Sequence, residues 1–143
     1  MSNTLKTIEE VKKDILSILQ ENNWKEILCT TPKGTYINPH QEDHVVMVSA
    51  KLAPTGVFET EEFCDELLKQ AIIVNIDNLA EFVIKGVPMK IFVNEHEENI
   101  GFVVETDEDA QITKTATHKT ALFVSKHKDS KTGFYVSSFS PVL

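Results

Sequence analysis

The sequence contains no arginine, only two cysteines and no long apolar run. Arginine binds phosphate and guanine through paired hydrogen bonds, so its absence argues against a reader of duplex DNA. No stretch approaches the roughly 20 apolar residues that cross a bilayer, and the first residues lack the apolar core of a secretory signal. We therefore expect a cytoplasmic bacterial or phage protein that does not bind membranes.

The two cysteines, Cys29 and Cys64, follow Leu28 and Phe63, and neither has a second cysteine at the spacing of a zinc or redox motif. We expect reduced thiols in the core, with a disulfide between them as the alternative. Gly-rich phosphate loops and the sequence signatures of serine hydrolases and zinc proteases are also missing. The sequence therefore predicts no cofactor.

Charge is distributed unevenly along the 143 residues. Residues 1–111 contain 9 lysines and 21 acidic residues, a net charge of −12, whereas residues 112–143 contain 5 lysines and one acidic residue, a net charge of +4. This division predicts an acidic body with a basic C-terminal edge. An acidic body repels nucleic acid at long range and favours a basic protein as its partner.

The N-terminal half predicts helices and short strands. Thr7 and Glu10 form a capping box ahead of apolar residues at helical spacing, and this first helix should end near residues 22–23. Thr60 should open a second helix, and Asp77 should cap a third helix that ends at Gly86. The strands expected between the first two helices are a hairpin of Trp24–Thr30 with Thr35–Ile37, and then His44–Val48.

The pattern changes to strands from residue 89 onward. Five strands are expected, and the short links between the last four predict an antiparallel meander. They are Lys90–Val93, Ile100–Glu105, Ile112–Thr117, Ala121–His127 and Phe134–Phe139. We therefore expect a single α+β domain over residues 1–143. It should contain an N-terminal helix and β-hairpin, two middle helices and a C-terminal four-stranded antiparallel meander.

Two groups of residues could bind a partner or a metal. The pair His40 and His44 has a spacing that suits a metal on a helix, but Pro39 and the strand-like run after His44 argue against a helix, so no metal is expected. The acidic loops are either solvated turns or a surface for a basic partner. They contain Glu95, Glu97, Glu98, Glu105, Asp107, Glu108 and Asp109.

The last third of the chain also gathers lysine, histidine and hydroxyl residues on neighbouring predicted strands. Such residues can bind a phosphate and move a proton, which is what metal-independent RNA cleavage requires. The alternative is a solvated strand face that protects the edge of a sheet.

Residues 99–141 resemble the C-terminal sheet of the barnase/EndoU/colicin/RelE-like nucleases. The likeness rests on Asn99–Val104, the Lys/Thr-rich strand 112–117, Leu122–Val124 and Gly133–Pro141. It implies helices followed by a curved antiparallel sheet, and a metal-independent RNase. The catalytic residues it implies are Lys114, His118, Lys126, His127 and Ser138.

Two functions follow from these observations. The first is a small acidic binding protein, such as an immunity protein or a phage anti-defence protein, that inhibits a basic protein partner. The second is an RNase-like enzyme that acts on RNA through the basic C-terminal sheet. The acidic composition and the missing catalytic signatures favour the first function.

Overall fold

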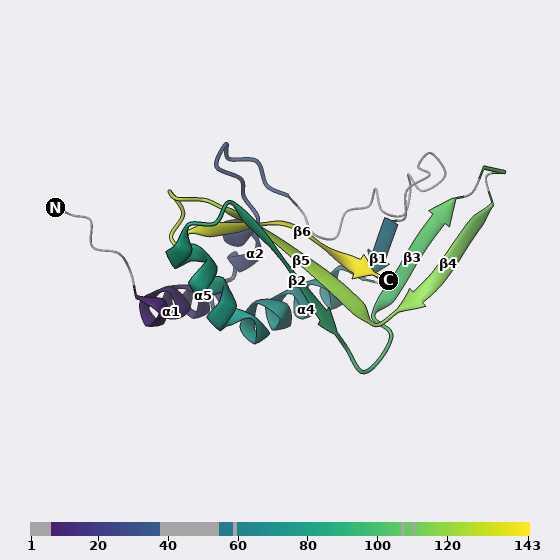
Figure 1. Cartoon of the computed structure of the whole chain (residues 1–143), viewed down its shortest axis with the longest axis horizontal. Coiled ribbons are helices and arrows are strands. Elements are labelled where there is room, and N and C mark those ends of the chain that lie inside the picture. The colour runs from purple at the N-terminus through teal and green to yellow at the C-terminus, as the bar shows by residue number, and fades with distance from the viewer. Residues whose placement is uncertain (1–6, 38–54, 59, 107, 110) are drawn as a thin grey trace.

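The computed structural model describes residues 7–37, 55–58, 60–106, 108–109 and 111–143. It confirms the α+β class, with helices ahead of antiparallel strands (Figure 1). The helices are α1 (Ile8–Leu19), α2 (Trp24–Leu28), α4 (Glu61–Val74) and α5 (Ile76–Lys85). The strands are β1 (Thr55–Phe58), β2 (Met89–Glu95), β3 (Gly101–Thr106), β4 (Ile112–Thr117), β5 (Lys119–Lys126) and β6 (Phe134–Val142).

The helix ends follow the local sequence closely. The Glu10 amide donates to Thr7 Oγ1 and the Thr7 amide donates to Glu10 Oε1, each over 3.1 Å, so the predicted capping box is confirmed. Thr60 caps α4, and Gly86 ends α5 in the left-handed conformation. The cap of α5 is Asn75, and the prediction of Asp77 was wrong, because α5 follows α4 directly and Asp77 lies inside its first turn.

The predicted N-terminal hairpin was wrong for its first strand, since Trp24–Leu28 forms helix α2. An isolated bridge between Thr30 and Tyr36 remains of the hairpin, with backbone hydrogen bonds from Thr31 to Thr35 and from Ile37 to Cys29 on either side of it. Tertiary contacts fix the helix, because Leu28 is fully buried and Lys25 Nζ lies 2.9 Å from Asp65 of α4. The expected strand His44–Val48 lies outside the described residues.

Strands β2 to β5 form one long antiparallel ribbon that is interrupted in the middle. Its first half pairs β2 with β5, and its second half pairs β3 with β4. At the junction, residues 96–100 lie opposite the single residue His118. Backbone hydrogen bonds from His96 to His118 and from Ile100 to Thr117 close the two sides of this loop.

The single four-stranded meander of the prediction is replaced by two three-stranded sheets, with strand orders β1-β3-β4 and β2-β5-β6. Strands β4 and β5 are neighbours in sequence but belong to different sheets, because the unequal junction at His118 divides the ribbon. The β3–β4 half therefore extends away from helices α1 and α5, with β1 beside it (Figure 1).

The core lies between the helices and one face of the β2-β5-β6 sheet. Phe92, Leu122, Val124, Val136 and Phe139 share this face and are buried with the apolar faces of α1, α4 and α5. The Phe58 ring of β1 stacks on Phe139 at 5.3 Å and joins the two sheets. The core also contains both cysteines, which are fully buried and free, and burial raises the pKa of each thiol to about 12.

Candidate functional site

An open groove of about 470 Å³ lies between helix α4 and the loop that joins β2 to β3. Its floor is apolar and includes Leu67 and Ile100, which are buried, and the half-buried Phe63. We call it the acidic groove, because four carboxylate residues and no lysine line it. These residues are Glu66 of α4 and Glu95, Glu97 and Glu98 of the strand end and loop.

The carboxylates of the acidic groove are largely unneutralised. Glu95 forms a long ion pair with Lys119, with 3.6 Å between Oε1 and Nζ. No ion pair of Glu66, Glu97 or Glu98 with another described residue is present, and all three side chains are exposed. Charges of one sign above an apolar floor concentrate the local field, so the groove attracts a cationic group.

The imidazole of His96 forms part of the groove wall. Its Nε2 lies 3.0 Å from Thr120 Oγ1, and Thr120 is fully buried in β5. Burial, and then the neighbouring His118, lower the pKa of His96 below its usual 6.5. The lowered pKa favours the neutral imidazole, so His96 opposes the negative charge of the groove less than an ordinary histidine would.

The structure separates the two predicted acidic loops. Glu105, Glu108 and Asp109 lie at the far end of the β3–β4 hairpin, about 20 Å from the acidic groove along a six-residue strand. Asp107 lies outside the described residues. Sequence reasoning missed Glu66, because only the packing of α4 against the loop brings it to Glu97 and Glu98. A row of exposed apolar residues on β2 was also missed, because Ile91, Phe92 and Val93 form a continuous apolar run that does not show which side chains are buried.

The five residues predicted to be catalytic do not gather at one place. His118 and Lys126 are at opposite ends of β5, about 26 Å apart along the strand. Lys114 is exposed on β4, four residues before His118. Ser138 lies opposite Phe123 on the sheet face turned away from the core, whereas Lys126 belongs to the other face. His127 follows Lys126, and its Nδ1 is buried without a hydrogen-bond partner among the described residues.

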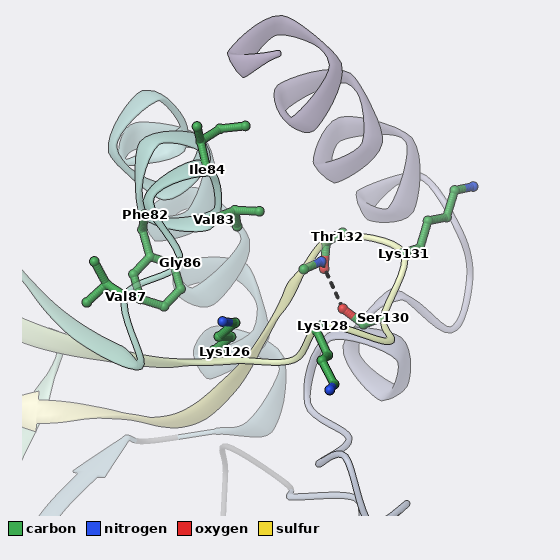
Figure 2. Close-up of a pocket in the computed structure, with 11 residues that line it drawn as sticks. Phe82, Val83, Ile84, Gly86, Val87, Lys126, Lys128, Ser130, Lys131 and Thr132 are labelled. Carbon is green, nitrogen blue, oxygen red and sulfur yellow. Dashed lines mark hydrogen bonds between the residues drawn. The ribbon is translucent and has the colours of Figure 1, made fainter. Parts of the chain in front are cut away.

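A second hollow, of about 250 Å³, lies at the Lys126 end of β5, between the end of α5 and the loop that joins β5 to β6. We call it the basic pocket. Figure 2 shows the Lys126 side chain directed toward it, whereas Lys128 and Lys131 extend away from it. The hydroxyls of Ser130 and Thr132 bond to the backbone and hold the loop. Three lysines thus line this pocket, and Lys126 is the one whose side chain is directed into it.

No three His, Cys, Asp or Glu side chains among the described residues are grouped as metal ligands. His40 and His44 lie outside these residues. None of the described helices has the length and apolar character needed to cross a membrane.

The fold is similar to that of a chain in the crystal structure of the CdiA-CT/CdiI complex from Y. kristensenii 33638. The two have a TM-score of 0.57 and 12% sequence identity, and the match covers 71% of this chain and 88% of that chain. No family model and no curated protein matches the sequence. The likeness concerns the fold, and the nuclease resemblance of residues 99–141 stays a prediction.

Proposed function

We propose that this chain is the inhibitory member of a toxin–immunity type of pair and that it binds a basic protein through the acidic groove. The acidic groove is the observation that carries this proposal. It combines an apolar floor with four carboxylates, three of which have no ion pair with a described residue, so a lysine or arginine side chain of a partner would fit it. The likeness to a chain of a complex supports a protein as the ligand.

The groove can be tested by reversing its charge. The double variant Glu97→Lys with Glu98→Lys should weaken binding of the basic partner by about 100-fold, because two attractive contacts become repulsive. The control is Glu21→Lys with Glu26→Lys, which makes the same change in net charge at exposed positions away from the groove. The control should stay within about threefold of the original affinity, since remote charges act mainly through screened long-range forces.

The partner for this measurement comes from affinity capture with the tagged chain at low and high salt, followed by purification of the captured protein. We expect a stoichiometric basic protein whose binding weakens as salt rises. Equal losses in the groove variant and in the control would contradict the acidic groove as the binding site. Capture of no basic protein would contradict the proposed function.

A second candidate function is metal-independent RNA cleavage, which the basic pocket favours, because Lys126 points into it and His127 lies next in the chain. Purified protein should then cleave RNA in the presence of a metal chelator. Lys126→Ala should abolish cleavage, whereas His118→Ala, at the opposite end of β5, should leave it unchanged. Growth separates the two functions. Expression of this chain alone arrests growth if it is an RNase, and protects cells that produce the partner if it is an inhibitor.

A further inference from the structure

Strand β2 has a free edge, since among the described strands it pairs only with β5. In antiparallel pairs, residues alternate between directing their backbone groups to the neighbour and directing them away. The amide of Lys126 donates to the Pro88 carbonyl and that of His96 to the His118 carbonyl, so the even-numbered residues face β5. The groups directed to the free edge therefore belong to Met89, Ile91, Val93 and Glu95.

The residues that direct their backbone to this edge also have exposed side chains. Met89 is 53% exposed, Ile91 47% and Val93 59%, and the three share the sheet face away from the core. Edge strands are usually protected by charged residues or proline. Strand β4, the edge of the other sheet, follows that rule, because Lys114 is exposed between Thr113 and Thr115. Strand β2 instead has three exposed apolar residues along its free edge, with Lys90 as the charged residue among them.

The free edge continues into the acidic groove, because β2 ends at Glu95 and the groove begins there. The geometry points to β2 as the docking edge for an extended segment of a basic protein, which adds to the sheet as an antiparallel strand. This inference rests on the proposed function, from which the basic partner is taken. It adds backbone hydrogen bonds between β2 and the partner segment, which set the direction and register of that segment.

The direction and register of the added strand follow from the pairing rules. Antiparallel pairing is the more stable arrangement and places the beginning of the partner segment beside Glu95. Residues that face each other in such a pair lie on the same side of the sheet. The segment therefore has a lysine or arginine first, beside the acidic groove. Apolar residues follow at every second position, opposite Val93, Ile91 and Met89.

The variant Ile91→Pro tests the free edge of β2 without disturbing the pairing of β2 with β5. It removes an N–H that points to the free edge and keeps every hydrogen bond to β5, and proline is tolerated at such positions. The matched control Ile91→Thr keeps this N–H and changes only the side chain. Unchanged amide spectra outside β2 confirm that both variants are folded.

The probe is the acetylated and amidated peptide Lys-Thr-Val-Thr-Val-Thr-Val, titrated into the full chain and followed by NMR of the backbone amides. We expect the Met89, Ile91 and Val93 amides to shift, and their hydrogen exchange to slow by at least about tenfold at saturation. Ile91→Pro should weaken peptide binding at least tenfold, and Ile91→Thr by less. A peptide with N-methyl groups on its first two valines keeps its side chains but should not bind.

Several outcomes overturn the inference. One is equal binding of the peptide and its N-methylated form, or shifts away from β2. Another is slow exchange of the β2 amides without peptide that depends on protein concentration, which would assign the edge to a second copy of this chain. A third is a captured partner that binds Ile91→Pro as tightly as the original but loses the Glu97→Lys, Glu98→Lys variant. In that case β2 is not the docking edge, whereas the proposed binding of a basic partner by the acidic groove is supported.

Discussion

The two ends of strand β5 carry opposite charge, and the charges have different origins. At the Lys126 end, the ammonium group lies beside Gly86, at the C-terminus of α5, where the helix dipole is negative and attracts a cation. At the Lys119 end, four carboxylates surround an apolar groove, and no helix N-terminus among the described elements accounts for them. The basic pocket thus has a structural explanation, whereas no such feature among the described residues explains the acidic groove, which is why we propose that it binds a partner.

The largest effect on stability is expected at the basic end. Gly133 has a φ of +86°, and a Cβ at this position would lie 2.6 Å from Val83 Cγ1. Gly133→Ala should therefore lower the free energy of unfolding by about 3 kcal/mol, through backbone strain and overpacking together. Urea unfolding measures this change.

The matched control for this substitution is Gly34→Ala. Gly34 has a nearly identical φ of +87°, but no atom lies within 4 Å of an added Cβ. Gly34→Ala should lower the free energy of unfolding by only about 1 kcal/mol, from backbone strain alone. Equal losses at the two glycines would show that contact with Val83 does not hold the basic end in place.

A smaller effect is expected at the acidic end from Thr120→Val, which preserves the shape of a buried side chain and removes the hydroxyl bonded to His96. The loss of this hydrogen bond should lower the free energy of unfolding by about 1 kcal/mol. Urea unfolding should show this loss, and amide spectra should change around residues 94–100 but not at the basic pocket. Amide shifts at the basic pocket as well would show that the two ends of β5 are not structurally independent.

The smallest effect concerns the protonation of His96. Its pKa is lowered in the folded state, so the unfolded chain binds more protons just below pH 6.5, and stability should fall as the pH drops through this range. NMR titration of the His96 ring should give a pKa below 6.5. His118→Ala should raise this pKa toward its usual value, because it removes the neighbouring histidine. A pKa of His96 at or above 6.5 in the original chain would contradict this account.

The sequence predicted those parts of the fold that depend on local chemistry. The Thr7 capping box, the Thr60 cap, the Gly86 helix end and the strands after residue 88 are all present. Helix α2 was missed because the burial of Leu28 and the pairing of Lys25 are tertiary. The division of the sheet was missed because it depends on how many residues face His118, which strand propensity does not encode.

The candidate sites show the same limit. Glu95, Glu97 and Glu98 could be selected from their spacing, but their partner Glu66 comes from a helix about 30 positions earlier and joins them only in the folded chain. The docking edge follows from the pairing register of β2, which decides that Ile91 faces outward while Phe92 is buried. A run of three apolar residues leaves that choice open.

The unequal junction at His118 has a consequence for how this protein can change its specificity. Within a paired strand, the loss of one residue moves every later side chain to the opposite face of the sheet. In the loop of residues 96–100, the two halves of the ribbon are already out of step, so the loss or gain of a residue there need not alter either register. Part of the acidic groove therefore lies where insertions and deletions disturb the pairing of the strands least. Recognition of a new partner could evolve there, or be grafted there, without redesigning the sheet.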